Sequence, residues 1–204
     1  MDIRRGGWLA PIIAAAIAAG GLLAGCSGTS ATSAVATAPP PAAGRAIPVA
    51  SIQRHNQDDV VFLQQMLPHH VQTGTISDLA RSKATSLKVK AIALRIKAAQ
   101  DQQITRIHDL LGAWGAPTSA GGSSSDQVPG MLSDQQIQQL KAATGNAFDQ
   151  LFLQLMITHQ QGAIQMSQTE LAKGSDPQAR RLAQDIITGQ QVEINQMQKL
   201  VQPS

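Results

Sequence analysis

The chain has 204 residues, 43% hydrophobic but only 2% aromatic, and its 16 Lys and Arg against 13 Asp and Glu give a formal net charge of +3. The basic residues are scattered and no aromatic residues alternate with them, which argues against a nucleic-acid-binding surface. Cys26 is the single cysteine, so an intramolecular disulfide is excluded.

Residues 1–26 have the pattern of a bacterial export signal. Arg4 and Arg5 give a positive start, Trp8 to Ala24 form an apolar core, and Leu-Ala-Gly-Cys at 23–26 ends the segment. The ending resembles a lipobox, in which Cys26 is lipidated and becomes the mature N-terminus. The alternative is an ordinary cleaved signal in which the cysteine stands by chance. The paired arginines also loosely resemble a twin-arginine signal, so the export route stays open.

Residues 27–54 are rich in Ser, Thr, Ala and Pro, with three consecutive prolines at 39–41. Such a segment buries too little apolar surface to offset the entropy of ordering, so we expect a disordered tether. Together with a lipidated Cys26, it would hold a folded domain, residues 55–202, at the outer face of the cell membrane.

Two segments of this domain match each other at an offset of 90 residues, which holds without a gap from residue 59 to residue 110. A single offset sustained over this length predicts an internal duplication. The matched pairs at its start are Asp59 and Asp149, Phe62 and Phe152, Leu63 and Leu153, Met66 and Met156, and His69 and His159.

Apolar residues recur at spacings of three and four, which predicts helices over 58–82, 87–113, 146–173 and 177–201. Ser133 and Gln136 have the spacing of a capping box and predict a short helix to about residue 144, ended by Gly145. Asp176 followed by Pro177 predicts the start of the last helix. The two halves, 55–114 and 146–202, are joined by a linker, 115–145. Two tandem hairpins, each with one apolar stripe, predict an all-α four-helix bundle.

Each half carries a Met and a His on one helix face. At 100° per residue, Met156, His159 and Met166 fall within about 80° of one another. Met66 and His69 occupy the equivalent arc. Thioether and imidazole ligands without thiolate suit Cu(I) or Ag(I), and imidazole also accepts Cu(II). The alternative is that these side chains only pack or form hydrogen bonds, which is the commoner role of Met in a helical core.

The same motifs resemble those of the domain-of-unknown-function family numbered 305, over essentially all of residues 55–201. The matching segments are MLPHH at 66–70, MITHQQGAIQM at 156–166 and QQVEINQM at 190–197. The resemblance implies a ferritin-like four-helix bundle made of two hairpins, common among exported bacterial proteins, of which some bind copper. Carried over position by position, the potential ligands are Met66, His69, His70, Met156, His159, Met166 and Met197.

Four positions depart from the family pattern. Gln160 stands where members usually have a second His, and Ile76 where they have Met. Gln103 and Ile107 replace Glu and Met in the first copy of the helix-end motif. The ligand set is therefore smaller than a full family set.

Three function classes are compatible with a helical bundle of this kind: a lipid-anchored envelope protein that binds or buffers copper, a structural or partner-binding bundle without metal, and a di-iron enzyme. The third requires a Glu-x-x-His pair on each of two helices. The only glutamates, Glu170 and Glu193, have no His three residues later. Motifs of hydrolases, zinc proteases and phosphate loops are missing from the sequence, so we expect a protein that is not an enzyme. The protein partner and the oligomeric state stay open.

Overall fold

The structure, a computed structural model, describes residues 55–119 and 128–201. Within these ranges the chain forms five α-helices and no strand, which confirms the all-α prediction. The predicted signal segment 1–26, the lipidation site Cys26 and the tether 27–54 lie outside the described residues. The helices are α1 (Gln57–Lys83), α2 (Leu87–Trp114), α3 (Asp134–Ala142), α4 (Gly145–Lys173) and α5 (Pro177–Val201).

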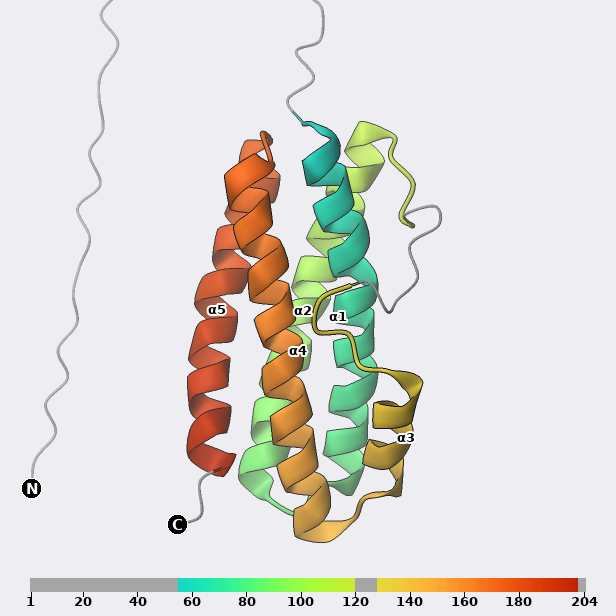
Figure 1. Cartoon of the computed structure of the whole chain (residues 1–204), viewed down its shortest axis with the longest axis vertical. Helices are drawn as coiled ribbons and strands as arrows, with labels where there is room; N and C mark the ends of the chain where they lie inside the picture. Colours follow the sequence, from blue (N-terminus) through green and yellow to red (C-terminus); the bar gives the residue numbers. More distant parts are fainter. Residues whose placement is uncertain (1–54, 120–127, 202–204) are drawn as a thin grey trace, which may run out of the picture. The chain divides into compact units, whose positions relative to one another are not determined.

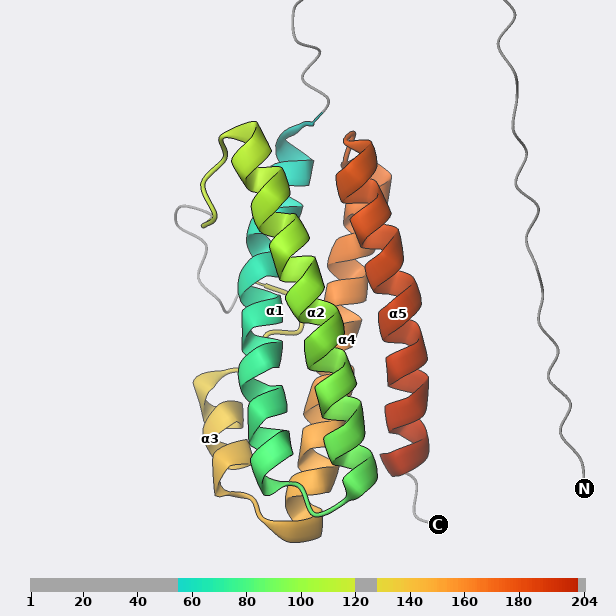
Figure 2. The ribbon, with the colours of Figure 1, turned by 180° about the vertical axis from the view of Figure 1, so that it is seen from behind.

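The four long helices pack side by side as a bundle (Figure 1). Helices α1 and α2 form one antiparallel hairpin, and α4 and α5 form the other. The hairpins meet mainly along α1 and α4, while α2 and α5 lie together on the face seen from behind (Figure 2). The short helix α3 packs against α4. No helix among the described residues is both long enough and apolar enough to cross a membrane.

Most helix ends follow the local signals in the sequence. Ser133 forms the predicted capping box before α3, and the Asp176 side chain accepts backbone hydrogen bonds at the start of α5. Gly145 does not end α3, contrary to the prediction. That helix already ends at Ala142, and Gly145 is the first residue of α4, with a φ of 58° that suits glycine.

The turn of each hairpin is held by a carboxylate from the other hairpin. Asp59 on α1 accepts a 3.0 Å hydrogen bond from the Ser175 amide in the α4–α5 turn. Asp149 on α4 accepts hydrogen bonds from the amides of Thr85 (3.0 Å) and Ser86 (2.8 Å) in the α1–α2 turn. These positions match at the 90-residue offset. These reciprocal hydrogen bonds hold the two hairpins together. The internal duplication itself stays a prediction.

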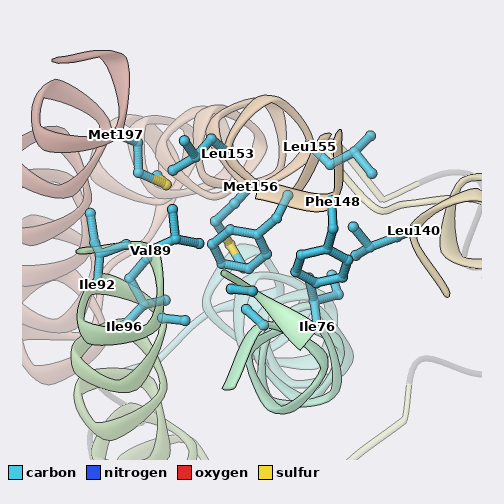
Figure 3. Packing of buried hydrophobic residues seen from close by; sticks show 14 of the residues in the cluster. Ile76, Val89, Ile92, Ile96, Leu140, Phe148, Leu153, Leu155, Met156 and Met197 are labelled. Atoms are coloured by element: carbon cyan, nitrogen blue, oxygen red, sulfur yellow. The ribbon is translucent and has the colours of Figure 1, made fainter. Parts of the chain in front are cut away.

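Apolar side chains fill the bundle as two clusters. The upper cluster joins the first half of α1 and the second half of α4 to the neighbouring parts of α2 and α5, and includes Phe62, Met66 and Met166. The lower cluster lies around Phe148 and Met156 and takes in the other halves of the same helices (Figure 3). Along α1 and α4, the buried side chains between the two clusters are polar.

Candidate metal centre

A layer of buried and half-buried polar side chains crosses the bundle between the two apolar clusters. Each long helix contributes to it, because the middle turns of the helices come together at the same level. Four of its members have no exposed surface. The layer consists of His69 and His70 on α1, Gln100 and Gln103 on α2, His159 and Gln160 on α4, and Gln190 and Glu193 on α5.

His69 and His159 face each other where α1 meets α4. Their ring centroids are 3.7 Å apart and the ring planes are inclined by 53°. Nε2 of His69 lies 3.1 Å from the carbonyl oxygen of His159. Because a carbonyl oxygen only accepts, Nε2 of His69 must carry the proton. Nδ1 of His69 therefore bears a lone pair and has no hydrogen-bond partner of acceptable distance and angle. The backbone of Pro129 also contacts this ring and, like that of His159, opposes the lowering of its pKa.

The side chain of Gln72 on α1 shows which ring nitrogen of His159 carries the proton. The backbone of Leu132 pairs with the Gln72 amide twice: Leu132 N donates to Oε1 at 2.8 Å, and Nε2 donates to Leu132 O at 3.0 Å. This pairing fixes which end of the amide is oxygen. Oε1 also lies 3.0 Å from Nε2 of His159, which must donate to it. Nδ1 of His159 is left with a lone pair and no partner.

The segment 128–133 crosses the bundle over α1 and α4 before the chain enters α3 (Figure 1). It contacts α4 at the backbone of His159 and α1 at the side chain of Gln72. Two glycines allow the close approach. Gly130 has a φ of 79°, and a Cβ there would lie 2.6 Å from the carbonyl oxygen of His159. A Cβ at Gly162 would collide with the carbonyl of Pro129. The contact is consistent with the complete burial of both imidazoles.

Burial keeps the three imidazoles of the layer neutral. Desolvation, with repulsion from His70, lowers the pKa of His159 to about 3. Desolvation lowers the pKa of His70 to about 4, although its hydrogen bond to Gln103 opposes the shift. The pKa of His69 is also held well below its ordinary value, first by burial and then by the two other histidines. A neutral imidazole is the form that binds metal ions.

Four further members of the layer form two side-chain pairs, whereas the amide groups of Gln100 and Gln190 are buried without a partner. Nε2 of His70 lies 2.7 Å from Oε1 of Gln103. Gln160 donates from Nε2 to Oε2 of Glu193 at 2.6 Å. Burial raises the pKa of Glu193 above its ordinary value, although the Gln160 hydrogen bond and the charge of Arg95 oppose the rise.

The structure brings the three predicted histidines together and distributes the predicted methionines on both sides of them. The ring centroids of His69 and His70 are 6.1 Å apart. In the described part of the chain, no group of three or more His, Cys, Asp or Glu side chains is arranged to hold a metal ion. Met66 and Met166 belong to the upper cluster, and Met156 and Met197 point into the lower one (Figure 3).

Gln72, Leu132 and the two glycines are features of the centre that the sequence analysis missed. Gln72 had a detectable signal, since it follows His69 by three residues on the same helix face. At the 90-residue offset Gln72 matches Gly162. The two halves therefore carry different residues at the place where the segment 128–133 crosses the bundle.

Residues 59–201 match the family model described as Domain of unknown function (DUF305). The chain belongs to the DUF305 family. A DUF305 fragment from Deinococcus radiodurans has a TM-score of 0.67 at 30% identity, covering 72% of this chain and 96% of its own. A candidate secreted DUF305 protein from Streptomyces coelicolor has a TM-score of 0.66 at 26% identity, covering 70% and 89%.

The copper protein CopM is a further structural relative. Its Cu(I)-bound form has a TM-score of 0.60 at 28% identity, covering 70% of this chain and 94% of its own. CopM has also been solved in Ag-bound and Cu(II)-bound forms. No curated protein sequence matches this DUF305 chain.

Proposed function

We propose that this DUF305 protein is exported and lipid-anchored at the cell envelope, where it binds Cu(I) or Ag(I) through His69 and His159. The observation that carries the proposal is the pair of Nδ1 lone pairs on two neutral, buried imidazoles in contact. Two buried acceptors without a donor are costly, and a bound cation would satisfy both. The relative CopM, which is found with Cu(I) and with Ag, supports the choice of ion.

The donors around the histidine pair fit a soft monovalent ion. Met66 and Met156 each stand one helical turn from one of the two histidines, so thioethers adjoin the imidazoles on both sides. Thioether and imidazole are ligands that Cu(I) accepts, and the layer offers no thiolate that could be oxidised outside the cell. We infer that the ion is a cargo that the protein buffers, and that the protein is not an enzyme.

The lipobox at 23–26 supports export and lipidation at Cys26, and the secreted relative supports export alone. The bundle is further proposed to be ferritin-like and to descend from one duplicated hairpin. The reciprocal contacts of Asp59 and Asp149 with the two turns support a common origin for the hairpins.

An anaerobic Cu(I) competition titration tests the proposed site. Residues 49–204, which form a compact unit, are compared with a variant carrying His69→Ala and His159→Ala. We expect stoichiometric binding by the wild type and a loss of affinity of more than about 100-fold in the variant. His108→Ala, which removes an exposed histidine of α2, is the matched control and should bind as the wild type does.

A second variant separates ligation from folding. In His69→Gln the side-chain amide can still donate to the carbonyl oxygen of His159, so the bundle should keep its helix content while the imidazole is lost. If His69→Gln and the double variant bind Cu(I) as tightly as the wild type, the histidines are packing groups. The protein is then a structural or partner-binding bundle.

A further inference from the structure

The two halves of the polar layer differ in one chemical respect. His70 with Gln103 and Gln160 with Glu193 occupy equivalent places at the 90-residue offset, with contacts of 2.7 and 2.6 Å. The first pair sets an imidazole against an amide, and the second sets an amide against a carboxylate. Neither pair sets an imidazole against a carboxylate, although the layer contains both groups.

We propose that Gln103 and Gln160 make the histidine centre selective for monovalent soft cations by denying it an imidazole–carboxylate pair, so that Zn(II) is excluded. This selectivity rests on the proposed function, because it concerns the same centre. The two glutamines are specificity-determining residues that act through their neighbours His70 and Glu193.

The cost of burying charge favours the monovalent ion. The Born penalty for moving an ion out of water grows with the square of its charge, so a divalent ion costs about four times as much as a monovalent ion of the same size. His69, His70 and His159 are fully buried, and an imidazole that binds a metal ion is neutral, so these side chains cannot offset the second charge. Without an anionic group in contact with these imidazoles, a divalent ion stays uncompensated.

Glu193 is the one carboxylate in the layer as described, and it is already engaged. Its Oε2 accepts the hydrogen bond from Gln160, whose own Oε1 is buried without a partner. The fully buried carboxylates of the described residues belong to the ends of the bundle, where Asp59 and Asp149 hold the turns. No described group of three or more His, Cys, Asp or Glu is placed to hold a metal, which agrees with a centre unsuited to Zn(II).

Gln103 and Gln160 can each be substituted by a residue of similar size. Gln103→Glu puts a carboxylate where the amide oxygen now contacts Nε2 of His70, and position 103 is half-buried, which moderates the cost of the new charge. For a divalent ion, His70 would serve as a third ligand beside His69 and His159 through its Nδ1, which is buried without a partner. Carboxylates that accept from the far nitrogen of a ligating histidine are typically worth about 10- to 100-fold in metal affinity. Gln160→His makes the converse change by setting an imidazole against Glu193.

Zn(II) and Ag(I) affinities of residues 49–204, measured side by side by competition titration, test the selectivity. We expect the wild type to bind Ag(I) and to show no Zn(II) binding above that of the His69→Ala/His159→Ala variant. Gln103→Glu should raise Zn(II) affinity by about 10- to 100-fold, with Ag(I) affinity changed less than about 3-fold. Gln102→Glu, which adds the same charge to the exposed face of α2, is the control and should leave Zn(II) binding unchanged.

The possible failures can be told apart. A wild type that binds Ag(I) and Zn(II) equally well overturns the selectivity and leaves the proposed function standing. A Gln103→Glu variant that gains no more Zn(II) affinity than Gln102→Glu overturns the role of Gln103. A wild type that takes up neither ion contradicts the proposed function, and the selectivity falls with it.

Discussion

The effect of pH on the free energy of unfolding can be predicted most quantitatively at Glu170, because this buried acid lies beside a second acid, Asp59. It lies on α4 under the α4–α5 turn, is 1% exposed, and packs so closely on Gly174 that a Cβ there would collide with its carboxyl group. Burial raises its pKa to about 8, and the adjoining Asp59 adds to the rise while Arg180 opposes it. Glu170 is therefore a protonated carboxylic acid in the folded protein at neutral pH.

The sign of the effect on stability follows from proton binding. Between pH 4.5, the ordinary pKa of Glu170, and about 8, the folded chain holds a proton that the unfolded chain releases. The free energy of unfolding then falls by about 1.4 kcal/mol for each pH unit of increase. Over this window the fall amounts to about 5 kcal/mol. Water that enters the turn relieves part of it, so we expect a measured effect of about 2 to 4 kcal/mol.

Urea unfolding at pH 5, 7 and 9 checks this value with the Glu170→Gln variant, which keeps the size of the side chain and a donor for Asp59. The variant should match the wild type at pH 5 and exceed its free energy of unfolding by about 2 to 4 kcal/mol at pH 9. Asp101→Asn, which changes an exposed acid of α2, should leave the pH profile of the wild type unaltered. Parallel profiles for Glu170→Gln and the wild type would refute the reasoning.

Two further predictions concern the contacts that hold the bundle and cover its centre. Asp149→Ala removes three hydrogen bonds from the α1–α2 turn and should lower the free energy of unfolding by about 2 to 4 kcal/mol in urea; a loss below about 1 kcal/mol would contradict this role of the carboxylate. Gly162→Ala should push Pro129 away from α4, lower the free energy of unfolding by about 1 to 3 kcal/mol, and speed amide exchange in the segment 128–133. The same exchange in Gly189→Ala, whose Cβ meets open space, should stay at the wild-type rate, and equal effects of the two alanines would disprove the close contact.

The helices could be predicted because their signals are local. Apolar spacing of three and four, the Ser133 capping box and the Asp176–Pro177 start each involve residues within a few positions of one another, and each predicted helix was found. The prediction for Gly145 is wrong because a glycine between two helices can end the first or begin the second. Its positive φ is compatible with both.

The centre could be predicted only in part, because helical phase gives the direction of a side chain and not its level in the bundle. Met156 and Met166 share an arc with His159, but ten residues separate the two methionines, which is about 15 Å along the helix axis. They consequently lie in different apolar clusters. The contact between His159 and Gln72 depends on how α1 and α4 are paired, and that of Gln72 with Leu132 depends on the path of the linker. Neither contact could be predicted from the spacing of residues in the sequence.

The nitrogen atoms of His69 and His159 allow the most direct test of the metal centre. The protein is labelled with ¹⁵N, loaded with Ag(I), and examined for scalar coupling between silver and the imidazole nitrogens. We predict coupling at Nδ1 of both histidines, with Nε2 remaining protonated toward the His159 carbonyl and Gln72. Coupling at Nε2, or at neither ring, would contradict a centre built on the two unpartnered Nδ1 atoms.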